Sequence, residues 1–92
     1  MNIKIRKGSN EEWVFNLLRK QSDYNTNIAN ITPTESGNKD KFNKGYAILK
    51  LEGIAHRVSN GIYLINPNVL RPDGNNYNKV LEHWLAVTNK NH

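Results

Sequence analysis

Two stretches of the chain concentrate side chains that could bind a polyanion. The first stretch, residues 39–50, contains these cationic and amide residues: Lys39, Lys41, Asn43, Lys44 and Lys50. The second stretch follows closely and contains Arg57, Ser59 and Asn60. Lysine and arginine neutralise phosphates, and the asparagine amide matches the hydrogen-bonding edge of adenine. Together the two stretches indicate recognition of a nucleic acid.

The first stretch has the pattern of an amphipathic helix over residues 39–51. At about 100° per residue, the side chains that share one third of the helix circumference predict its buried side. They are Phe42, Gly45, Tyr46 and Leu49. Gly53 is placed to end the helix in a left-handed conformation.

The outward side of this helix should carry small, polar and cationic groups. It is centred on Asp40, Lys44, Ala47 and Leu51. A helix fits the major groove of DNA, so its exposed side chains could reach base edges. We predict that Lys41, Asn43 and Lys44 read bases and that Lys39 and Lys50 contact phosphates.

The second stretch leads into a predicted β-hairpin at Asn60-Gly61. Asn-Gly is the strongest short signal for a two-residue turn in which both central residues have positive φ. Such a turn sets four facing pairs: Ser59 with Ile62, Val58 with Tyr63, Arg57 with Leu64, and His56 with Ile65. Asn66-Pro67 should end the second strand, because proline cannot donate to a sheet. We predict that Arg57, Ser59 and Asn60 contact the DNA backbone or the minor groove.

The remaining elements must support these two stretches. We expect a short strand over residues 1–5, a capped helix over 10–20, a short second helix over 22–32 and a loop over 34–38. Apolar side chains at helical spacing support the second of these helices: Tyr24, Ile28 and Ile31. The best-patterned helix comes last, with the stripe Tyr77, Val80, Leu81, Trp84, Leu85 and Thr88. It could pack on Trp13 and Leu17 of the first helix or form the seam of a homodimer.

This order of elements predicts an α+β fold, a small winged helix-turn-helix with a C-terminal amphipathic helix. The length of 92 residues predicts a single domain over residues 1–92. The formal net charge of +5 suits a polyanionic partner.

Several classes of chemistry have no support in the sequence. The absence of cysteine rules out disulfides, thiolate zinc sites and cysteine nucleophiles. His56, His83 and His92 lack the spacing of metal ligands, and no phosphate-binding glycine loop or catalytic triad order is visible. No stretch approaches the roughly 20 apolar residues that span a bilayer, and the N-terminus does not resemble a signal peptide. We therefore expect a cytoplasmic, non-enzymatic protein that needs no cofactor or metal and does not contact membranes.

One segment carries a family resemblance. LKLEGI at residues 49–54, Arg57, and GIYLINP at residues 61–67 resemble the winged-helix core of plasmid replication proteins of the RepL type. The resemblance implies double-stranded DNA binding in plasmid or phage replication or its control. A regulator of transcription or an accessory factor that uses the same module fits the resemblance nearly as well as an initiator.

Two alternatives remain open at the level of sequence. The apolar side chains Ala47, Ile48 and Leu51 near the outward helix face would suit a protein-interaction module that docks on a host replication or transcription protein. The positive charge would also permit RNA binding, although the aromatic stacking motif of sheet-based RNA readers is missing.

Overall fold

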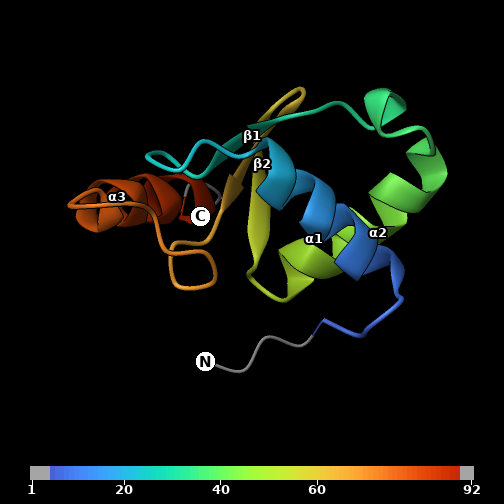
Figure 1. Ribbon diagram of the computed structural model, residues 1–92, viewed down its shortest axis with the longest axis horizontal. Coiled ribbons are helices and arrows are strands. Elements are labelled where there is room, and N and C mark those ends of the chain that lie inside the picture. Colours follow the sequence, from blue (N-terminus) through green and yellow to red (C-terminus); the bar gives the residue numbers. More distant parts are fainter. Residues whose placement is uncertain (1–4, 90–92) are drawn as a thin grey trace.

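The computed structural model describes residues 5–89 and contains helices on both sides of a small sheet (Figure 1). The elements are α1 (Asn10–Gln21), β1 (Ile28–Asn30), the 3-10 turn η1 (Thr34–Ser36), α2 (Lys39–Leu51), β2 (Ala55–Ser59), β3 (Ile62–Ile65) and α3 (Tyr77–Thr88). Within the described range, three α-helices and a three-stranded antiparallel sheet confirm the expected α+β class. The strand predicted at residues 1–5 falls mainly outside this range; Ile5, which is described, belongs to no strand and packs against the core.

Helix α1 starts where the sequence predicts, because its first turn is capped. The Ser9 hydroxyl accepts a hydrogen bond from the Glu12 amide (3.2 Å), and the Glu12 carboxylate accepts one from the Gly8 amide (2.8 Å). Val14 and Leu18 are fully buried on the inner side of the helix. Their spacing of four residues places both on one side of the helix.

The second helix predicted over residues 22–32 is wrong. Asn27 adopts a left-handed conformation (φ 59°) that interrupts any helix, and its side-chain amide donates to the carbonyls of Ile65 (3.2 Å) and Leu70 (2.6 Å). These long-range bonds fix the following residues against β3 as strand β1. The predicted loop at residues 34–38 is present and includes η1, which Gly37 ends with φ 92°.

The hairpin is present, but its predicted register is correct only at Ser59 and Ile62. A bulge between Arg57 and Ser59 shifts the other pairs by one residue, so that Arg57 faces Tyr63, His56 faces Leu64 and Ala55 faces Ile65. Gly61 has positive φ (74°), whereas Asn60 does not, so the two central residues of the turn do not both adopt the positive φ that was expected.

This one-residue shift changes the side of the sheet on which residues lie, because side chains alternate along a strand. His56 joins Leu64 on the side that faces α3, and Arg57 joins Tyr63 on the side that faces α2. The predicted register, which put His56 opposite Ile65 and therefore on the same side as Tyr63, is wrong.

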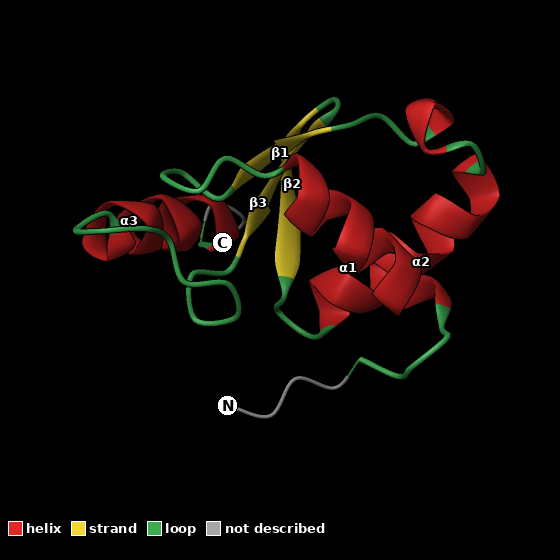
Figure 2. Ribbon diagram, in the orientation of Figure 1, coloured by secondary structure: helices red, strands yellow, loops and turns green. Residues whose placement is uncertain are grey.

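The two sides of the sheet bury separate apolar clusters. Helices α1 and α2 cover one side, around Tyr63 and Ile65, and α3 covers the other (Figures 1 and 2). Val80 and Trp84 of α3 pack on Leu64, so α3 covers the sheet and not Trp13 and Leu17 of α1, which was one of the two alternatives. Leu85, which belongs to the predicted apolar stripe, is 47% exposed.

Helices α1 and α2 approach each other closely at Gly45. A β-carbon at this position would lie 2.4 Å from the Asn10 carbonyl oxygen and 2.6 Å from Cγ2 of Val14. The buried side predicted for α2 is therefore correct, and glycine is the residue that allows this approach.

Candidate nucleic-acid interface

Both ends of helix α2 are fixed by residues that lie next to them in the sequence. At its start, the Asn38 side chain accepts a hydrogen bond from the Lys41 amide (3.1 Å). At its end, Gly53 has φ 70° and donates to the Lys50 carbonyl (3.2 Å), while Ile54 donates to the Leu49 carbonyl (2.9 Å). This pair of bonds is the Schellman motif and confirms the role predicted for Gly53.

Most of the candidate residues of α2 are exposed to solvent. Asn43 and Lys44 lie on the outer side with Asp40, Ala47 and Leu51, whereas Lys39 and Lys50 are exposed at the two ends of the helix and lie at a different angle around it. This set of exposed residues combines three ammonium groups and one amide with one carboxylate. It has the donors that phosphates and base edges require, next to an apolar end at Leu51, which is 79% exposed.

Lys41 differs from the other lysines of α2. It is half-buried, and its ammonium nitrogen lies 4.6 Å from the centre of the Trp13 ring on α1. A cation over an indole face is attracted by the ring quadrupole. The structure therefore places this ammonium against α1, and contact with a base would require it to leave the ring.

The hairpin is joined to α2 through Tyr46. Its hydroxyl accepts a hydrogen bond from the Arg57 amide (2.6 Å), and its ring packs edge-on against Tyr63 at 5.1 Å between centres. Tyr63 in turn packs edge-on against Phe42 at 5.6 Å. The hydrogen bond from Arg57 and the packing of Tyr63 against Tyr46 and Phe42 thus hold β2 and β3 at one position along α2.

Burial favours the neutral form of these two phenols. It raises the pKa of Tyr46 and of Tyr63, and the positive charge of Arg57 opposes the rise in both cases. The Arg57 side chain itself remains exposed, and so do Ser59 and Asn60 at the hairpin tip. The structure thus brings Arg57 to the side of the hairpin that is attached to α2.

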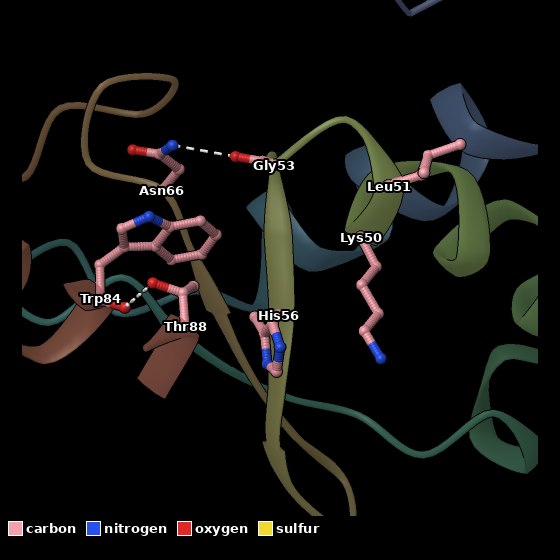
Figure 3. Close-up of a pocket in the computed structure, with 7 residues that line it drawn as sticks. All are labelled: Lys50, Leu51, Gly53, His56, Asn66, Trp84 and Thr88. Carbon is pink, nitrogen blue, oxygen red and sulfur yellow. Dashed lines mark hydrogen bonds between the residues drawn. The ribbon is translucent and has the colours of Figure 1, made fainter. Parts of the chain in front are cut away.

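Lys50 lies at the far end of α2, beside a groove that α3 closes. The groove has a volume of about 400 Å³ and includes Lys50, Leu51, His56 and Trp84 in its walls (Figure 3). The Thr88 hydroxyl there is engaged with the Trp84 carbonyl (2.8 Å). Lys50 is therefore separated along the helix from Lys39 and Asn43, which lie near its start.

Most cations in the described part of the chain have no carboxylate partner. Across residues 5–89, the one ion pair within 4.0 Å joins Arg6 and Glu11, at 3.5 Å. The lysines of α2 and Arg57 are thus available to phosphates without first breaking an ion pair. In the same part of the chain, no three histidine, aspartate or glutamate side chains come together as a metal site.

Three features of this region have no clear signal in the sequence. The bulge at Val58, the bond between Tyr46 and Arg57, and the stacking of Lys41 on Trp13 each depend on residues that are distant in the chain or on strand register. The sequence indicates the Tyr46 contact only in part, because it predicts this tyrosine on the inner side of a helix that a hairpin follows.

Comparison with known proteins found no match among family models, curated proteins or solved structures. Among the described helices, none has the length and apolar character needed to cross a membrane.

Proposed function

We propose that the protein binds double-stranded DNA as a winged helix-turn-helix, with α2 in the major groove and the β2–β3 hairpin as the wing. The element order supports this proposal: α1, β1, η1, α2, β2 and β3 follow one another, and the sheet order is β1-β3-β2. In this interpretation, the short turn η1 stands where a second helix would precede the recognition helix.

The observation that carries the proposal is the outer side of α2 together with its attached hairpin. Lys39, Asn43 and Lys44 are exposed and have no ion-pair partner within the described residues, and the Tyr46 hydroxyl holds Arg57 beside the same helix. A helix and a hairpin fixed to each other can contact a groove and the neighbouring phosphates at the same time.

The residues divide into two roles. Lys39, Lys50 and Arg57 would supply positive charge for phosphates. Lys44 would contact the acceptor groups of guanine or a phosphate, and Asn43 would make a bidentate contact with adenine. Lys41 contributes charge from its position over Trp13. Ser59 and Asn60 would donate to the backbone beside the wing. The biological setting, control of replication or transcription in a plasmid or phage, follows from the resemblance to RepL-type proteins.

Selection of bound duplexes from a random pool tests this function. We expect enrichment of a motif, and we expect Asn43→Ala to relax the preference at one position while non-specific affinity changes little. A bidentate contact is worth about 1–3 kcal/mol of discrimination against the wrong base. Absence of enrichment with the wild-type protein would contradict sequence recognition by α2.

A second function has one specific observation in its favour. Leu51 is 79% exposed beside the groove between α2 and α3, which would suit docking on a host replication or transcription protein. Leu51→Ser separates the two functions: it should leave duplex binding intact if DNA is the ligand of the lysine-bearing part of α2. Loss of duplex binding in this variant would place Leu51 in the DNA contact instead.

A further inference from the structure

A second groove lies at the C-terminal end of α1, away from the outer side of α2. Its volume is about 560 Å³, and its walls are formed by Asn16, Arg19, Lys20, Tyr24 and Leu70. Two cations, an amide, an aromatic ring and an aliphatic side chain therefore border one depression. No acidic residue is part of its lining.

Tyr24 is the unusual member of this group. It is 72% exposed, whereas Ile31, with which it was expected to share a helix, is buried. A tyrosine ring left in water forgoes the stabilisation that burial of its apolar surface would provide. Unlike an aliphatic side chain, a solvent-facing aromatic ring in a groove can stack its π-face on a planar ligand.

The turn that carries Tyr24 is held by many hydrogen bonds. The Asp23 carbonyl accepts from the amides of Thr26 (3.3 Å) and Asn27 (2.8 Å), and the Asp23 carboxylate accepts from the Asn25 amide (2.7 Å). The Tyr24 carbonyl accepts from the Asp73 amide (2.9 Å) in the loop before α3. The backbone at Tyr24 is thus positioned before any ligand binds, which reduces the entropy lost on binding.

The two cations beside the ring are free to bind an anion. Arg19 and Lys20 are exposed and make no ion pair with any described carboxylate within 4.0 Å. Cations in the last turn of α1 also interact favourably with the helix dipole. The dipole does not explain why an exposed aromatic ring lies beside them. Charge for phosphates next to a ring for bases is the combination that binds single-stranded nucleic acids.

The groove and the α2 surface lie on opposite sides of the α1–α2 pair. Asn10 and Val14 face α2 at Gly45, whereas Asn16 and Arg19 project from the other side of α1 at 100° per residue. A straight duplex on the outer side of α2 would leave this groove uncovered. We propose that the groove binds a single-stranded nucleic acid, with one base stacked on Tyr24 and its phosphates at Arg19 and Lys20.

Fluorescence anisotropy with labelled oligonucleotides tests the proposal. The probes are a 12-nucleotide thymidine strand and the matching uridine strand, which distinguish DNA from RNA as the natural source of the ligand. We expect Tyr24→Ala to weaken binding about 5- to 150-fold, the effect of losing one stacked base, and Tyr24→Phe to bind like the wild type. Arg19→Ala and Lys20→Ala should weaken binding and reduce its salt dependence.

Control variants keep this proposal separate from duplex binding by α2. Lys44→Ala should leave binding of the single strand unchanged, and Tyr24→Ala should leave the melting temperature unchanged because the ring is exposed. An oligoglutamate of equal charge should not compete. Three results would overturn the proposal: no binding of either strand, equal binding by Tyr24→Ala and the wild type, or equal competition by oligoglutamate.

Discussion

Replacing Gly45 by alanine tests the packing that sets the position of α2. In an exposed helix, glycine to alanine stabilises by about 0.5–1 kcal/mol, because alanine has the higher helix propensity. Here the added carbon would lie 2.4 Å from the Asn10 carbonyl oxygen and 2.6 Å from Cγ2 of Val14. Ordinary contacts of this kind begin at 3.4 Å, so about 1 Å of separation is missing.

The energetic consequence follows from which atoms must move. Val14 could rotate, but the Asn10 oxygen belongs to the backbone, so α1 as a whole must shift. Overpacking of a rigid contact costs typically about 1–3 kcal/mol. A cost near the upper end, less the propensity gain, leaves a destabilisation of about 2 kcal/mol, or roughly 8–16 °C in melting temperature for a domain of this size.

Thermal unfolding followed by circular dichroism measures this effect. Ala47→Gly is the matched control, since it exchanges the same two residue types on the exposed side of the same helix and should cost about 1 kcal/mol. Adding a methyl group at residue 45 and removing one at residue 47 should thus both destabilise. A melting temperature for Gly45→Ala equal to or above that of the wild type would refute the close approach of α1 and α2.

Three further predictions concern the supports of the sheet. Asn27→Gly keeps the left-handed conformation but leaves the Ile65 and Leu70 carbonyls without the side-chain amide. We therefore expect urea unfolding to show a free energy of unfolding lower by about 1–3 kcal/mol. Asn27→Ala should lower it by about 1 kcal/mol more, because alanine disfavours the left-handed conformation. Equal stability of these two variants would argue against a conformational contribution. Tyr46→Phe removes the acceptor of the Arg57 amide and should cost about 0.5–1.5 kcal/mol, whereas an unchanged unfolding midpoint would mean that water replaces the hydroxyl fully. Because burial raises the pKa of Tyr46 and Tyr63, the folded state favours their neutral forms. The resulting contribution to the free energy of unfolding is complete below the unfolded-state pKa of about 10 and is lost as the pH rises toward the folded-state pKa. Unfolding measured at a series of alkaline pH values would detect this loss.

Local signals in the sequence located the helices and the turns that end them. Ser9 and Gly53 act on amides or carbonyls within five residues, so their roles could be predicted without knowing the fold. The buried side of α2 was equally predictable, because helical periodicity depends on neighbours along one helix.

Long-range contacts explain the errors. Asn27 belongs to a run of turn-forming residues, and only its bonds to Ile65 and Leu70, 38 and 43 residues away, explain why a strand follows it. The bulge at Val58 adds one residue to a strand, and this changes which side of the sheet His56 and Arg57 occupy. The spacing of Tyr24, Ile28 and Ile31 was interpreted as a helix, whereas Ile28 begins strand β1.

The candidate site was predictable as a set of cations, but not as a surface. Asn43 and Lys44 lie on the outer side of α2 as periodicity predicts. The displacement of the Lys41 ammonium toward Trp13 and the attachment of Arg57 to Tyr46 required the tertiary structure, since both contacts join separate elements.

The salt dependence of duplex binding tests the central proposal most directly. If α2 and the hairpin contact phosphates, the logarithm of the binding constant should fall linearly with the logarithm of salt concentration, and each of Lys44→Ala and Arg57→Ala should reduce the slope by about 0.9. Lys79→Ala is the matched control, because Lys79 is an exposed cation on α3, across the sheet from α2. Wild-type protein without salt-sensitive duplex binding, or a Lys79→Ala variant with the same loss of slope as the other two, would contradict DNA binding by α2 and the hairpin.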